Sequence, residues 1–354
     1  MGSTGRSAVG YEGAMGLEKI TIRDVAMAAG VSTATVSRSL NLPEQVTPKL
    51  RAQVEEAAAR LGYLAHGPAR ALASRRSGTV AAVVPTLDNP VFATCIDALE
   101  SRLDAHGLVL LVARTGYDPE REARGLRALL ERGVDGVMLV GVSHSPEVWR
   151  LLRTARDVPA VLTWCEGSGA ALPCIGFDNV AAARRVVEHL VGLGHRRIAM
   201  IAGITRGNDR AAARVEGVRQ GLADAGLPWP ASRLTERAYS VADGMSAVQS
   251  LMTLRPRPTA VVCGNDHLAF GALAGARALG LRVPGDLSVT GFDDLDFAAH
   301  ATPALTTVRV PAAEMGLAAA DHLAAQAAGQ APPPLAGLKA PLVLRESTGR
   351  RSEQ

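Results

Sequence analysis

The sequence predicts a small all-helical module followed by a larger body built from two α/β lobes. The chain has 354 residues, which is too long for one ordinary hydrophobic core. From residue 78 onward, short apolar runs alternate with segments of helical length, as buried parallel strands and their crossover helices do. Positive charge is unevenly distributed: residues 17–78 contain nine Lys and Arg against five Asp and Glu, whereas the rest of the chain after residue 78 contains 28 of each. This asymmetry indicates that the front module meets a polyanion.

The first predicted helix follows Thr21, which with Asp24 forms a plausible N-terminal cap pair. Apolar residues then recur at helical spacing from Ile22 to Ala29, and Gly30 ends the helix. The third predicted helix has Thr47 as its cap, Pro48 at its first position and Gly62 at its end, with apolar residues along one face.

The second predicted helix lies in the stretch VSTATVSRSLN and is capped by Ser32. Val36 and Leu40 face inward, so the outer face carries small and hydroxylated side chains and one arginine, at Thr33, Ala34, Ser37 and Arg38. Ser and Thr are mediocre helix formers but bond phosphate oxygens well. Three helices with a short glycine turn after the first predict a helix-turn-helix whose second helix enters the major groove. A helical bundle without such a function is the alternative.

Residues 65–77 separate this module from the body. Pro68 can open a short helix in PARALAS, but so brief a helix is unstable alone in water. The segment is therefore either a flexible linker or a hinge helix that orders only on DNA and inserts Leu72 into the minor groove.

The body shows two successive series of strand and helix patterns, which predict two doubly wound parallel lobes. Ligands of such sheets lie beyond the carboxyl ends of the strands. This rule directs attention to residues 86–92, Trp164, residues 208–214, Tyr239, Asn265, Asp266 and Asp293.

Several function classes are not favoured. The body lacks GxGxxG after its first strand and has no GxxxxGK[ST], HExxH or GxSxG motif, so we expect no enzyme, cofactor or metal site. Residues 1–16 lack the apolar core of a signal peptide and are expected to be disordered. No apolar run reaches membrane-spanning length. The four cysteines show no CxxC spacing, which suggests buried free thiols in the cytoplasm.

Together these motifs resemble the LacI/GalR family of bacterial transcription regulators. The resemblance rests on segments in family order: ITIRDVAMAAGVSTATVSRSLN, VTPKLRAQVEEAAARLGYLAHGPARALAS, HLVGLGHRRIAMIAG, NDRAAARVEGVRQGL, AVVCGNDHLAFGAL, VPGDLSVTGFDD and TPALTTVRVP. It covers residues 17 to about 349. It implies a homodimer with a helix-turn-helix headpiece (17–64), a hinge (65–77) and a body (78–354) like the periplasmic sugar-binding proteins. The N-lobe would comprise about 78–177 and 310–338, and the C-lobe about 178–309 and 339–349.

The resemblance also implies roles for individual residues. Those matching the family's positions for bases, phosphates and the minor groove are Ser32, Thr33, Ala34, Thr35, Ser37, Arg38, Asn41, Arg70 and Leu72. Those matching its cleft, or lying beside it at strand ends, are Asn89, Val91, Phe92, Trp164, Asn208, Arg210, Arg214, Tyr239, Asn265 and Asp293. A small effector held there, a sugar or sugar acid, would control affinity for a palindromic operator. A cytoplasmic small-molecule sensor that does not act through DNA is the alternative reading.

Three positions depart from the family's pattern. Ala65 replaces a common proline before the hinge, and Trp164 stands where several members have a carboxylate. Arg210 replaces a frequent Ser or Thr and adds a second cation to a pocket in which Asp293 is expected to pair with one arginine. A buried unpaired guanidinium is costly, so an anionic effector such as a sugar acid would fit. Alternatively, Arg210 turns outward or pairs with Asp209 or Asp266.

Overall fold

The computed structural model describes residues 20–41, 45–63, 76–166, 172–335 and 337–351. Two compact units divide the chain, residues 1–77 and residues 78–354, and each is described by itself. The predicted residues Arg70 and Leu72, the tail 1–16 and most of the hinge lie outside the described residues.

The described residues of the first unit form three helices, α1 (Ile22–Ala28), α2 (Thr33–Asn41) and α3 (Pro48–Leu61). The Asp24 carboxylate accepts hydrogen bonds from the backbone N–H and the hydroxyl of Thr21, each at 2.7 Å, which confirms the predicted cap pair. Gly30 turns the chain with φ +62°, a conformation that glycine adopts without steric cost. The three helices bury a common apolar core formed by Val25, Ala26, Ala29, Val36, Val54, Ala57 and Ala58. The predicted helix-turn-helix is confirmed.

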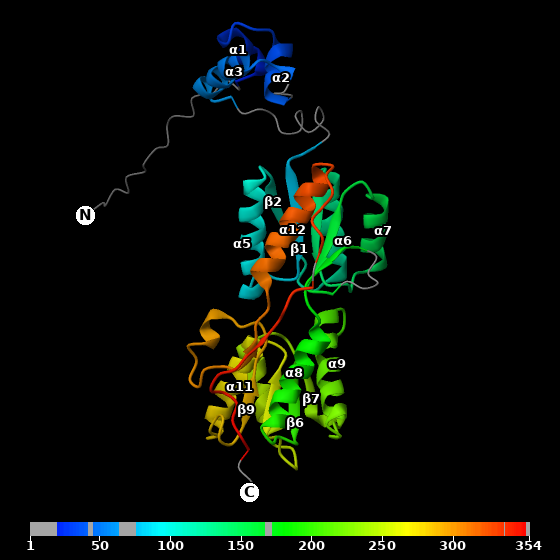
Figure 1. The fold of residues 1–354 in the computed structure, drawn as a ribbon, viewed down its shortest axis with the longest axis vertical. Helices are drawn as coiled ribbons and strands as arrows, with labels where there is room; N and C mark the ends of the chain where they lie inside the picture. Colours follow the sequence, from blue (N-terminus) through cyan, green and yellow to red (C-terminus); the bar gives the residue numbers. More distant parts are fainter. Residues whose placement is uncertain (1–19, 42–44, 64–75, 167–171, 336, 352–354) are drawn as a thin grey trace, which may run out of the picture. The chain divides into compact units, whose positions relative to one another are not determined.

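The second unit consists of two α/β lobes, which Figure 1 shows one above the other within residues 78–351. A five-stranded sheet of order β2-β1-β3-β4-β5 forms the N-lobe, and its paired strands run parallel. Its elements are β1 (Thr79–Val84), α5 (Pro90–Ala105), β2 (Val109–Arg114), α6 (Pro119–Glu131), β3 (Gly136–Val140), α7 (Pro146–Thr154), β4 (Ala160–Thr163) and β5 (Cys174–Ile175).

A parallel four-stranded sheet of order β7-β6-β8-β9 forms the C-lobe. Its elements are α8 (Asn179–Gly192), β6 (Ile198–Gly203), α9 (Asp209–Asp224), β7 (Leu234–Arg237), α10 (Val241–Leu251), β8 (Ala260–Cys263), α11 (Asp266–Ala278) and β9 (Ser288–Thr290), with 3-10 turns at Ala231–Arg233 and Asp296–Ala298. The central strands are apolar and fully buried because helices cover both faces.

One predicted strand is displaced along the sequence. We expected a strand at residues 237–240 (RAYS), whereas β7 covers Leu234–Arg237 and pairs with residues 200–203 of β6. Ser240 is instead the N-cap of α10, because its hydroxyl accepts the N–H of Asp243 at 3.0 Å. Tyr239 therefore lies in the connection just beyond the end of β7, where ligand-binding side chains of parallel sheets are found.

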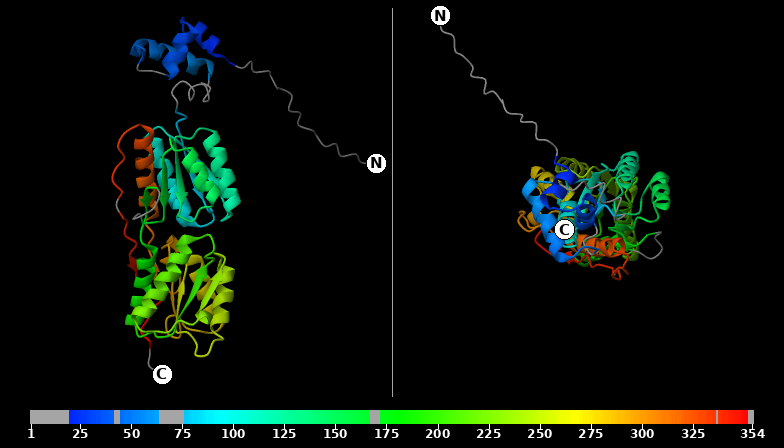
Figure 2. Two further views of the ribbon diagram at one scale, coloured as in Figure 1. Left: turned by 90° about the vertical axis from the view of Figure 1, so that its right-hand side faces the viewer. Right: turned by 90° about the horizontal axis from the view of Figure 1, so that it is seen from above.

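The chain crosses between the lobes more than once. After the C-lobe it returns through β10 (Thr307–Val308) to α12 (Ala312–Ala327), which packs beside α5 in the N-lobe (Figure 1). It then runs back through β11 (Leu342–Val343), antiparallel to β10, and the red C-terminal segment ends on the C-lobe in Figure 1 and in the left view of Figure 2. A single hydrophobic cluster includes residues of both lobes, among them Val80, Phe92, Met200 and Phe292, so the crossovers join lobes that share a core.

Candidate functional site

The headpiece presents the predicted outer face of α2. Thr33, Ala34 and Arg38 are exposed, whereas Val36 is fully buried. Ser32 caps the helix by accepting the N–H of Thr35 at 3.1 Å. Hydroxyls at the start of a helix, backbone N–H groups and an exposed arginine together suit contacts with phosphates and base edges. The backbone of Asn41 closes α2, and the side chain of Asn41 lies outside what the structure describes.

In the body, all ten cleft residues suggested by the sequence lie around one small cavity of about 20 Å³. They come from both lobes and from the carboxyl ends of several strands. Asn89 caps α5, Asn208 caps α9 and Asn265 caps α11, each accepting a backbone N–H at the helix start. Helix starts therefore hold these three side chains at fixed positions on the cavity wall. The described residues that line it are Asn89, Val91, Phe92, Tyr117, Trp164, Asn208, Arg210, Arg214, Tyr239, Asn265 and Asp293.

Backbone strain is concentrated at this cavity. Among the described residues, four that are not glycine have positive φ, and three of them line the cavity: Tyr117 (62°), Trp164 (58°) and Asp293 (127°). Such conformations cost of order 1–3 kcal/mol each and persist where the surroundings enforce them, often at ligand sites. The fourth, Asp294, directly follows Asp293 and holds Arg309 and Arg345 by ion pairs of 2.7 Å, which fixes the loop that carries Asp293.

A buried ion pair crosses the cavity floor. Arg214 Nη1 lies 4.0 Å from Asp293 Oδ1, and Arg214 also donates to the Asn179 side chain at 3.0 Å and to the Gly264 carbonyl at 2.7 Å. Its guanidinium stacks on Phe292 at 3.6 Å from the ring centroid. Asp293 accepts a hydrogen bond from Asn89 Nδ2 at 3.1 Å. Burial raises the pKa of Asp293 to about 7.

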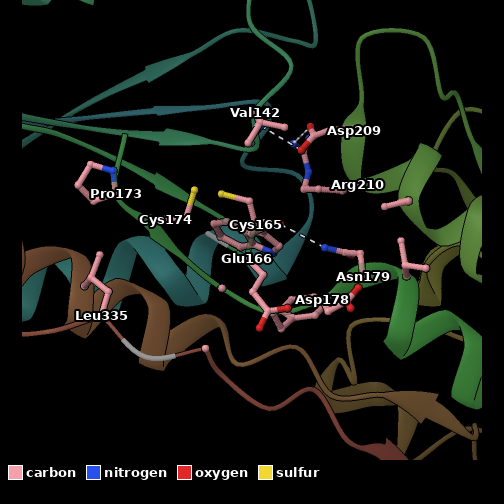
Figure 3. Close-up of a pocket in the computed structure, with 16 residues that line it drawn as sticks. Val142, Cys165, Glu166, Pro173, Cys174, Asp178, Asn179, Asp209, Arg210 and Leu335 are labelled. Atoms are coloured by element: carbon pink, nitrogen blue, oxygen red, sulfur yellow. Dashed lines mark hydrogen bonds and ion pairs between the residues drawn. The ribbon is translucent and has the colours of Figure 1, made fainter. Parts of the chain in front are cut away.

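The structure contradicts the expectation that Arg210 lacks a protein carboxylate. Arg210 Nη1 lies 2.9 Å from Asp209 Oδ1 and 3.3 Å from the carbonyl oxygen of Val140. Asp209 in turn accepts the backbone N–H of Val142 at 3.0 Å, and Figure 3 shows this junction of Val142, Asp209 and Arg210. The alternative pairing with Asp209 is therefore the one that forms. Arg210 remains on the cavity wall, but its charge is already compensated.

Sequence reasoning missed Tyr117 at this cavity. Tyr117 follows β2, and its ring lies 6.3 Å from that of Tyr239, centroid to centroid. The sequence contains a signal for it, because TGYDP directly follows the apolar run of β2 and so lies at the carboxyl end of that strand. Gly203 at the end of β6 makes room for Tyr239, since a Cβ there would overlap the Tyr239 ring.

The chain matches two family descriptions. Residues 21–65 match the "Bacterial regulatory proteins, lacI family", and residues 77–332 match the "Periplasmic binding proteins and sugar binding domain of LacI family". The chain belongs to the LacI family. Members of this family are bacterial regulatory proteins, so this chain is a DNA-binding transcription regulator with a headpiece and a periplasmic-binding-protein-like body.

Individual LacI-family proteins are similar over nearly the whole chain. The HTH-type transcriptional regulator GntR of Escherichia coli K12 is 34% identical over 313 residues, covering 88% of this chain and 93% of GntR. The lac repressor dimer bound to operator and the anti-inducer ONPF superposes with a TM-score of 0.81 at 29% identity, covering 94% of this chain and 100% of that one. The complex of the regulator CelR with cellobiose has a TM-score of 0.67 at 31% identity, covering 93% and 99%.

No helix within the described residues is both long and apolar enough to cross a membrane. The same part of the chain contains no group of three or more His, Cys, Asp and Glu side chains placed to hold a metal ion.

Proposed function

We propose that this protein is a homodimeric repressor, acting in the cytoplasm, that binds a near-palindromic operator through α2. A small metabolite, a sugar or sugar acid, held between the lobes controls its affinity for the operator and is not turned over. The observation that carries the proposal is the convergence of three strained residues and three helix-capping asparagines on one cavity, in a chain that also presents a capped recognition helix.

The small volume of this inner cavity supports a mechanism in which the lobes must part before any part of the metabolite enters it. Its volume of about 20 Å³ leaves room for about one water molecule, whereas sites that hold metabolites measure roughly 300–1,000 Å³. Hydrogen bonds from Asn89 to Asp293 and from Val142 to Asp209 join N-lobe residues to C-lobe residues. A ligand that replaces such contacts favours one lobe arrangement by its differential affinity for the two states.

The operator and the dimer are proposed from the solved lac repressor complex, which is a dimer on its operator. Two copies of one recognition helix read two-fold related half-sites, so the operator is expected to be a near-palindrome. Arg70 and Leu72 of the hinge are proposed to enter the minor groove at its centre.

The proposal is tested first by selecting operators from random DNA and comparing the native protein with Arg38→Ala. An arginine bidentate to guanine O6 and N7 gives about 1–3 kcal/mol of discrimination, so the variant should lose preference at one base pair per half-site. A phosphate-only contact would weaken all sequences equally. An unchanged sequence preference would contradict the assignment of Arg38. A chain that selects no sequence at all would contradict operator binding.

A further inference from the structure

A second, larger cavity adjoins the small one at the mouth of the cleft. Its volume is about 720 Å³, and it shares Asn89, Tyr117, Asn208 and Tyr239 with the inner cavity. This volume is in the range of sites that hold metabolites. The outer cavity can therefore receive a sugar-sized ligand while the inner one is closed.

Three arginines line this mouth cavity: Arg114 at the end of β2, Arg206 in the β6–α9 connection and Arg237 at the end of β7. Within the described residues none of the three forms an ion pair, and Arg237 Nη1 donates a hydrogen bond to the carbonyl of its neighbour Glu236. Asp88 is the one carboxylate among the described residues that line this cavity, so these residues carry an excess of positive charge.

Arginines with and without an ion pair both occur elsewhere in the body. Arg150, Arg282 and Arg345 each lie within 2.8 Å of a carboxylate oxygen, whereas Arg153 forms no ion pair with the described residues. The mouth arginines are distinguished because three of them line one cavity. Arginines gathered in one concave site without such partners are placed to meet a ligand's anion, because the guanidinium fork matches carboxylate and phosphate oxygens.

Two buried polar atoms of the cleft have no hydrogen-bond partner among the described residues. One is the amide nitrogen of Asn265, a residue that is 1% exposed and lines the inner cavity. In the mouth cavity, His267 likewise has a buried Nδ1 without a partner. Buried polar atoms are nearly always satisfied, so both atoms are available to ligand or water oxygens.

We propose that the effector is an anionic sugar whose carboxylate or phosphate binds Arg114, Arg206 and Arg237. Its hydroxyl groups would meet Asn89 and Asn208, and its ring would lie against Tyr117 and Tyr239. Because Arg114 belongs to the N-lobe and the other two arginines to the C-lobe, the anion joins the lobes. This inference rests on the proposed function. The reason to expect an anionic ligand is now the three mouth arginines, because Asp209 neutralises the charge of Arg210.

The test measures ligand binding to the full chain by calorimetry and thermal shift. The probes are glucose, gluconate and glucose 6-phosphate, the corresponding galactose series, and inorganic phosphate alone. We expect at least one anionic probe to bind tenfold or more tightly than its neutral counterpart, and its affinity to fall as salt rises. Comparing gluconate with glucose 6-phosphate shows whether the anion that the site binds is a carboxylate or a phosphate.

Substitutions of the three mouth arginines test whether these side chains bind the anion. The combined R114Q, R206Q and R237Q variant should weaken the anionic probe at least tenfold, and the three corresponding lysine substitutions should restore part of the affinity because they keep the charge. Arg153→Gln, which removes one exposed arginine of α7 outside the lining of the cavity, is the control to be compared with each single glutamine variant and should change nothing. The inference is overturned if neutral sugars bind as tightly as their anionic partners, if the glutamine variant binds anions as the native chain does, or if no anionic probe, phosphate included, binds.

Operator binding measured in parallel separates this inference from the proposed function. If a neutral sugar releases the operator, the proposed function stands and the anion site is wrong. If no operator is bound, the proposed function fails, whereas anion binding at the mouth is still scored by the arginine variants.

Discussion

At the scale of single residues, the charge of Arg210 is compensated from both lobes. Asp209 at the adjacent position supplies a carboxylate, and the Val140 carbonyl, 70 residues away in the chain, accepts a hydrogen bond. The sequence offered Asp209 as one of two carboxylate partners without deciding between them. Neighbouring residues at a helix start usually point in different directions, so only the three-dimensional arrangement of β3 and α9 brings Asp209 and Arg210 to one junction.

A first residue-scale prediction concerns Asp293. Burial raises its pKa from 3.8 to about 7 in the folded state, so between about pH 4 and 7 the folded protein holds a proton that the unfolded chain has released. The unfolding free energy should therefore fall as the pH rises through this window and level off above it. Asp293→Asn should remove up to about 1.4 kcal/mol per pH unit of that slope.

Urea denaturation at several pH values checks this expectation. Burial also raises the pKa of Asp266, to about 6, so part of the slope should survive in the variant. Asp104→Asn, at an exposed position late in α5, is the control. Equal slopes for the native protein and Asp293→Asn would show that the carboxyl titrates normally.

A second residue-scale prediction concerns the four thiols. Burial raises the pKa of Cys95 to about 12 and raises that of Cys263 further. Burial and the adjacent Cys174 thiol raise the pKa of Cys165. Cys174 is half-buried and lines a cavity of about 750 Å³, shown in Figure 3.

Since the thiolate is the reactive form, brief alkylation of the native protein at neutral pH should modify Cys174 at least tenfold faster than Cys95 or Cys263. Peptide mass spectrometry reports each rate, and alkylation in urea should remove the difference. Equal native rates would contradict the burial of these thiols.

At the scale of elements, sequence features inside a helix predicted its bounds well, whereas the bounds of a strand that depend on its pairing partner were predicted less well. Caps, glycine ends and periodicity placed α1, α2 and α3 within a residue or two, because each signal lies inside the element that it bounds. The strand expected at residues 237–240 was displaced because β7 is defined by its pairing with β6, and because Ser240 competes as a helix cap. Pairing partners far apart in sequence leave no local signal.

The element-scale prediction is that Ser32 stabilises the recognition helix. Ser32→Ala removes the acceptor for the Thr35 N–H and a 2.9 Å contact between the two hydroxyls, which should destabilise the helix by about 1 kcal/mol. Hydrogen exchange of the full chain should then be faster at the first backbone amides of α2 and unchanged in α3. Thr33→Ala, one position later and exposed, is the matched control. Unchanged exchange in Ser32→Ala would mean that the cap does not hold the helix.

At the scale of the whole body, the sequence predicted two lobes but not how they close. Closure depends on a few contacts between segments that are distant in sequence, such as Asn89 with Asp293 and Val142 with Asp209. Neither contact follows from periodicity or from a motif. The ten expected cleft residues nevertheless lie together, since the carboxyl ends of parallel strands meet at one edge whatever the degree of closure.

A substitution at Gly141 tests the contacts between the two lobes. Gly141 follows β3 with φ +79°, and a Cβ there would overlap the Arg210 guanidinium and the Asp209 carboxylate. Gly133 has a similar φ of +73° in the same lobe, but a Cβ there would have no atom within 4 Å. Alanine at either position should cost about 1–2 kcal/mol for the left-handed backbone, and Gly141→Ala should additionally force the junction of Val142, Asp209 and Arg210 apart.

We therefore expect the amide of Val142, which donates to Asp209 in the closed body, to lose its protection from hydrogen exchange in Gly141→Ala and to keep it in Gly133→Ala. The Gly141 variant should also have the lower melting temperature of the two. Because both variants share the backbone strain, the difference between them isolates the contacts across the lobes. Equal protection of Val142 in the two variants would mean that this junction does not hold the lobes closed, and that closure depends on Asn89 and Asp293 at the inner cavity.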